Sequence, residues 1–201
     1  MAEWSPRVKR VGSNEPGRLA FANALIRERK FREAQEEFEG ILQTEPKSFA
    51  ANAGIGLALQ LQGQFDKSLQ AFDRARALDP MQPMAPLLAG FSHLVKNNVE
   101  EAIASFKSAI DLDPRVVIAH LGLARALNRK GDTQSAIAAA EEALRLDPKM
   151  SGARLLLARL REAGGDSADA IAELERVLET EPRQRAASMR LAAIYEKRGQ
   201  S

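Results

Sequence analysis

Five of the nine prolines in this chain of 201 residues lie at one fixed spacing. Pro46, Pro80, Pro114, Pro148 and Pro182 each stand 34 residues from the next, and an acidic residue precedes every one of them. A spacing this regular indicates an internal repeat. In such proteins each repeat is one supersecondary element that cannot bury its apolar face alone and therefore packs on its neighbours.

We number each repeat so that its proline is the thirty-second residue, and this numbering sets the boundaries of the repeats. A segment before the first repeat, residues 1–14, carries Arg7, Lys9, Arg10 and Trp4. We expect a basic N-terminal arm that is disordered; the alternative is an arm whose Trp4 packs on the first repeat or into a groove. The predicted repeats are residues 15–48, 49–82, 83–116, 117–150 and 151–184, followed by a half repeat or capping helix at 185–201 that could equally be the cut end of a longer protein.

Residues at equivalent positions of successive repeats form columns, and two of these columns predict a pair of helices in each repeat. Small residues recur where two helices must approach closely, and residues that tolerate positive φ recur at the expected turn. Asp132 and Asp166 follow turn glycines, where a helix N-cap is needed. The small column is Ala22, Gly56, Gly90, Ala124, Ala158 and Ala192, and the turn column is Arg29, Gly63, Asn97, Gly131, Gly165 and Gly199.

Together these columns predict an all-α fold. Apolar residues at i, i+3, i+4 and i+7 follow the turn, and the residue before each proline is pushed out of the α region, which ends the second helix. We expect eleven helices, five antiparallel pairs and a single one, without any strand. Stacked pairs of this kind wind into a right-handed superhelical solenoid.

This pattern resembles the tetratricopeptide repeat family in its 34-residue period and in its columns of small and large residues that end in proline. The segment 63–80, GQFDKSLQAFDRARALDP, is similar to the second helix of that family, and the resemblance runs from residue 15 to about residue 199. It implies a protein-binding function. The early Trp of the family is absent, and its column holds Arg18, Asn52, Pro86, His120, Arg154 and Ser188.

The first helices of such a stack line its concave surface, where ligands of this family usually lie. Their second, fifth, ninth and twelfth positions share one face, and the thirteenth flanks it. The centre of the predicted groove is apolar and its C-terminal half is basic, so the ligand should be apolar in the middle and acidic or polar beside the arginines. The alternative is that the apolar residues only pack helix on helix. The predicted groove residues are Asn23, Ala53, Leu57, Leu61, Leu87, Phe91, Leu94, Arg125, Asn128, Arg129, Arg159 and Glu162.

A carboxylate clamp of the kind some members of the family use is not expected. Asn23 matches one clamp position, but Leu19, Gly54, Met84 and Leu88 stand where polar and basic residues are needed.

The sequence also argues against catalysis and against other kinds of partner. Cysteine is absent, and the two histidines fall in different columns, with His93 expected in the core and His120 on a helix surface or at an interface, so neither a metal nor a cofactor is expected. Lys and Arg number 29 against 27 Asp and Glu, a balance that does not suggest nucleic-acid binding. No apolar run is long enough for membrane insertion.

We therefore predict a cytoplasmic, non-catalytic scaffold that binds a peptide or helical segment of another protein. One alternative is the N-terminal docking or regulatory region of a larger enzyme. Another is a self-assembling scaffold, a homo-oligomer formed through the exposed apolar groove or the C-terminal helix.

Overall fold

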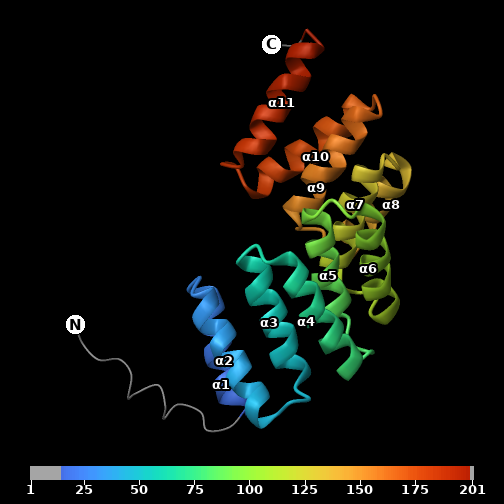
Figure 1. The fold of residues 1–201 in the computed structure, drawn as a ribbon. Helices are drawn as coiled ribbons and strands as arrows, with labels where there is room; N and C mark the ends of the chain where they lie inside the picture. Colours follow the sequence, from blue (N-terminus) through green and yellow to red (C-terminus); the bar gives the residue numbers. More distant parts are fainter. Residues whose placement is uncertain (1–14, 200–201) are drawn as a thin grey trace, which may run out of the picture. The chain divides into compact units, whose positions relative to one another are not determined.

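A computed structural model describes residues 15–199 of the chain, which form eleven helices and no strand (Figure 1). The predicted helix count and all-α class are therefore confirmed over this range, while the predicted basic arm at residues 1–14 lies outside it. The helices are α1 (Glu15–Arg27), α2 (Phe31–Thr44), α3 (Phe49–Leu61), α4 (Phe65–Leu78), α5 (Met84–Val95), α6 (Val99–Leu112), α7 (Val117–Lys130), α8 (Thr133–Leu146), α9 (Ser151–Ala163), α10 (Ser167–Thr180) and α11 (Arg185–Lys197).

The helices group into two compact units, Met1–Asn97 and Asn98–Ser201. The N-terminal unit holds α1 to α5, and the C-terminal unit holds α6 to α11. The boundary between them falls at the turn between α5 and α6, in the middle of the predicted third repeat. The 34-residue period showed no sign of this division, because the sequence columns continue through it unchanged.

In the N-terminal unit each helix packs on the next one along the chain, and the first helices α1, α3 and α5 also contact one another in that order. The aromatic rings of Phe38 and Phe72 are fully buried. A Cβ atom on Gly56 would lie 2.4 Å from the ring of Phe72, a separation that real side chains do not reach. The small column therefore exists because an aromatic ring of the second helix lies directly against the first helix.

The C-terminal unit repeats this packing. Phe106 and Leu174 are fully buried, and Ala124 and Ala158 of the small column are 0% exposed. The first helices α7 and α9 contact each other, and α11 packs on α10. Both units thus place first helices side by side, and within each unit every helix packs on its neighbours in the chain.

The helix ends agree with the predicted turn chemistry. All six residues of the turn column have positive φ, from 62° at Asn97 to 89° at Gly165. Asp132 and Asp166 are N-caps, and each accepts a hydrogen bond from a backbone N–H three residues later, at 3.1 and 3.2 Å. These caps satisfy donors that the first turn of a helix cannot satisfy by itself.

In the column that lacks the early tryptophan, polar side chains bond to backbone carbonyl groups. Asn52 donates to Ser48 O at 3.0 Å, and Arg154 donates to Pro148 O at 2.7 Å. His120 is 7% exposed and its Nε2 lies 2.9 Å from Pro114 O, so it does not lie on the helix surface, the first of the two places predicted for it. The sequence could not show that the Pro114 carbonyl group would lie within reach of this ring.

Candidate functional site

The first-helix face of the N-terminal unit rests on a rigid pair of helices, α3 and α5. Gln60 of α3 donates hydrogen bonds of 3.1 Å to Leu88 O and to Ser92 Oγ, both on α5. Ser92 Oγ also lies 2.9 Å from Ser68 Oγ of α4, and both serines are completely buried. Buried polar contacts of this kind lock the relative position of the helices, since a shift would leave them unpaired.

Apolar side chains are exposed on this face. Leu61 is 45% exposed, Met84 48% and Val95 61%. Leu57 and Phe91 are partly buried beside them. Residues four apart share one side of a helix, so Leu57 with Leu61 and Phe91 with Val95 form two parallel apolar stripes on adjacent helices. We call Leu57, Leu61, Met84, Phe91 and Val95 the apolar face.

The structure places the other apolar residues of the predicted groove in the interior. Ala53, Leu87 and Leu94 are buried, so they pack helix on helix as the alternative interpretation held. Leu61 reaches the surface, together with Met84 and Val95, which take the second and thirteenth positions of their repeat on the same predicted face. A helical repeat pattern predicts which side of a helix faces the solvent only to within one residue. An error of one residue exchanges a buried position for an exposed one. Asn23 is exposed on α1.

The corresponding face of the C-terminal unit carries exposed basic residues. Arg125, Asn128 and Arg129 of α7 and Arg159 of α9 are all exposed. Arg125 and Arg159 take the ninth position of their repeats, which Leu57 and Phe91 take in the N-terminal unit. The two units therefore present different chemistry from the same positions of the repeat.

Glu162, the last predicted groove residue, holds the C-terminal helix. Its carboxylate accepts a hydrogen bond of 2.7 Å from Arg190 Nε and one of 3.3 Å from Lys197 Nζ, both on α11. Partial burial opposes ionisation, but these two cations outweigh it and hold the pKa of Glu162 below its usual value. Its role in packing α11 could not be predicted, because Arg190 and Lys197 are 28 and 35 residues away in the chain.

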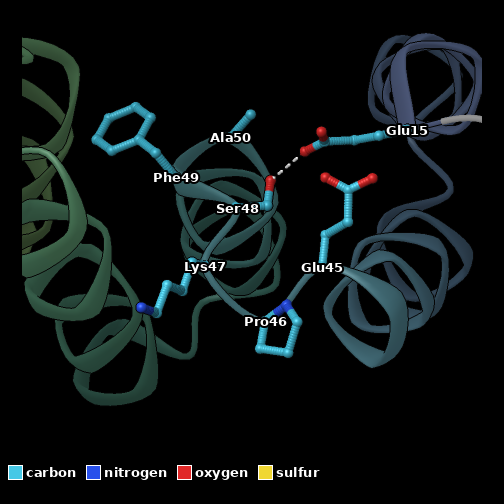
Figure 2. Close-up of a pocket in the computed structure, with 7 residues that line it drawn as sticks. All are labelled: Glu15, Glu45, Pro46, Lys47, Ser48, Phe49 and Ala50. Carbon is cyan, nitrogen blue, oxygen red and sulfur yellow. Dashed lines mark hydrogen bonds between the residues drawn. The ribbon is translucent and has the colours of Figure 1, made fainter.

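A shallow depression of about 520 Å³ lies where α1 begins, beside the turn between α2 and α3 (Figure 2). Glu15 and Glu45 face each other there, and Ser48 Oγ donates a hydrogen bond of 2.5 Å to Glu15 (Figure 2). The bonds from Ser48 and then Glu45 lower the pKa of Glu15, and the bond to Glu15 raises the pKa of Glu45. The sequence analysis missed this pair, whose members are 30 residues apart in the chain.

Two features of other protein classes are absent from the described residues. Between residues 15 and 199, no group of three or more acidic or histidine side chains is arranged to hold a metal ion. No helix in that range is both long and apolar enough to cross a membrane.

Comparison with protein families gives one consistent result. The tetratricopeptide repeat family matches residues 19–83 and 87–151, and a second description of the same repeat matches residues 127–194. Comparison with curated proteins found no significant match.

Solved structures of similar fold share little sequence. A thermophilic tetratricopeptide repeat protein of Thermus thermophilus is 21% identical with a TM-score of 0.73, and the alignment covers 90% of this chain and 98% of that one. MamA from Desulfovibrio magneticus is 20% identical with a TM-score of 0.74, covering 87% and 99%. YrrB, described as having an unusual peptide-binding site, is 15% identical with a TM-score of 0.68, covering 88% and 91%. At these identities the likeness concerns the fold alone.

Proposed function

Because the chain belongs to the tetratricopeptide repeat family, whose members are generally protein-interaction modules, we propose that it is a non-catalytic scaffold. It binds a peptide or helical segment of another protein on the faces of its first helices. The segment is apolar where it meets the N-terminal unit. YrrB, a protein of similar fold, is described as having a peptide-binding site, which supports a peptide as the ligand class.

The apolar face is the observation that carries this proposal. Leu61, Met84 and Val95 expose large apolar side chains, whereas Ala53, Leu87 and Leu94 on the same two helices are buried. A contiguous exposed apolar patch on a folded protein usually marks a binding site. The buried contacts of Gln60 and Ser92 keep α3 and α5 fixed beneath it, so binding would not have to order the surface first.

Affinity should come mainly from this apolar face. Burial of one large apolar side chain contributes roughly 1.5–3 kcal/mol, whereas an exposed ion pair contributes about 0–1 kcal/mol. Loss of two apolar contacts should therefore weaken binding far more than loss of a charged contact at the edge.

The proposal is tested with peptides selected on the intact chain from a random display library. Leu61→Asp combined with Val95→Asp places two charges on the apolar face. Both side chains are largely exposed, so the fold should survive, which circular dichroism would verify. We expect titration calorimetry to show binding weakened by about a hundredfold or more, because two buried apolar contacts are lost and two charges are desolvated.

Leu78→Asp is the matched control, since Leu78 is a large apolar residue that is 37% exposed on α4. It should leave the affinity unchanged. If the control abolishes binding and the double variant does not, the ligand lies on the second helices and the assignment is wrong. Failure to select any peptide would argue against peptide binding itself.

A further inference from the structure

Arginines occupy equivalent places on two adjacent first helices of the C-terminal unit. Arg125 of α7 and Arg159 of α9 are both at the ninth position of their repeats, and these two helices contact each other. Both side chains are exposed. Two guanidinium groups therefore emerge from the same side of neighbouring helices, with Arg129 a further helical turn along α7 from Arg125.

These two arginines differ from the other arginines of α9. Arg154 forms an ion pair with the buried carboxylate of Glu173 at 2.8 Å, and Arg161 pairs with Glu141 at 2.9 Å. Across residues 15–199, neither Arg125 nor Arg159 forms an ion pair or a side-chain hydrogen bond with another described residue. The unit thus neutralises the arginines that pack between its helices and leaves two cations on the first-helix face without a counter-charge.

The two helices also come close beside Arg125. A Cβ atom on Gly152 of α9 would lie 4.0 Å from Nη2 of Arg125, so this guanidinium group of α7 reaches the surface of α9. Ile118, two helical turns before Arg125 on α7, is 43% exposed and adds an apolar side chain to the same face.

We propose that this α7–α9 face binds an acidic peptide segment of another protein, whose carboxylates pair with Arg125 and Arg159 while a neighbouring apolar side chain lies against Ile118. The inference rests on the proposed function and specifies the chemistry of the partner. Charge complementarity carries it, since a guanidinium fork matches the two oxygens of a carboxylate.

A peptide fits this surface better than a nucleic acid does. The chain carries 29 Lys and Arg against 27 Asp and Glu, so the positive charge is local and does not extend over a long polyanion track. Neither α7 nor α9 contains Phe, Tyr or Trp, whereas nucleic-acid surfaces usually add aromatic rings on which bases stack.

The test uses the full chain labelled with ¹⁵N and a soluble oligoglutamate peptide as the probe, at low salt. The side-chain Nε signals of Arg125 and Arg159 and the amides of α7 and α9 should show the largest shifts. Arg125→Glu combined with Arg159→Glu should weaken the fitted affinity by about tenfold or more, because two attractive pairs become repulsive. The remaining affinity should fall further when salt is raised to about 0.5 M.

Arg115→Glu combined with Arg183→Glu is the matched control. It changes the net charge equally at two exposed residues that follow prolines of the repeat, and it should leave the affinity unchanged. The inference is overturned if both double variants lose binding alike, if the shifts lie on other helices, or if a thymidine oligonucleotide of equal charge binds more tightly to the same residues. It is also overturned if the shifts depend on protein concentration alone, which would identify a second copy as the occupant. In each of these cases the apolar-face test above still decides the proposed function separately.

Discussion

At the scale of single residues, the turn column includes a strained position that the sequence conceals. Arg29 has φ of 63° and Asn97 has φ of 62°, although glycine fills the other turns. The left-handed region costs a residue with a side chain roughly 1–2 kcal/mol, and asparagine tolerates it better than most residues. Arg29 is therefore the least favourable turn residue among those described.

Arg29→Gly should accordingly raise the free energy of unfolding by about 1 kcal/mol, measured by urea denaturation. Gly131→Ala at the equivalent turn, where φ is 87°, should lower it. Unchanged stability in Arg29→Gly, together with a loss in Gly131→Ala, would show that Arg29 makes a compensating contact.

The facing carboxyl groups of Glu15 and Glu45 predict a pH dependence. Hydrogen bonding to Glu15 raises the pKa of Glu45, so the folded state favours protonated Glu45. That contribution to stability is present at low pH and is lost as pH rises through the raised pKa. Glu45→Gln keeps a hydrogen-bond donor and removes the charge. Its melting temperature should exceed that of the wild type at about pH 7, and the difference should shrink near pH 4. A difference independent of pH would contradict this account.

At the scale of the helices, the features common to all repeats could be predicted from the sequence, whereas the features specific to one repeat could not. The columns predicted eleven helices, the caps at Asp132 and Asp166 and the positive φ of the turns, because local backbone chemistry decides these. They could not separate buried Leu94 from exposed Val95, which are adjacent on α5. They also could not show which arginines would find a carboxylate, since those pairs join different helices.

Glu162 illustrates such a pair, and it predicts how α11 is held. Hydrogen bonds from Arg190 and Lys197 to Glu162 join α9 to α11. Because its pKa is lowered in the folded state, this contribution is present at neutral pH and is lost as pH falls through that lowered value. Glu162→Gln should speed amide hydrogen exchange in α11 while α7 and α8 keep their protection. Glu141→Gln, which removes an exposed partner of Arg161, is the control. Equal exchange in α11 for both variants would show that apolar packing alone holds the helix.

At the scale of the whole molecule, one repeat pattern carries two kinds of surface. Leu57 and Phe91 in the N-terminal unit and Arg125 and Arg159 in the C-terminal unit take the same repeat position. The repeat pattern sets the backbone and the core, whereas the chemistry of the ninth position differs between the two units. The division at Asn97–Asn98 separates the apolar surface from the basic one.

Binding of the partner by the first helices is best tested by a crystal structure of the chain with a library-selected peptide. We expect the peptide to contact Leu57, Leu61 and Val95 on α3 and α5. A peptide bound only to the second helices, such as α2, α4, α8 or α10, would show that the first helices are not the binding site.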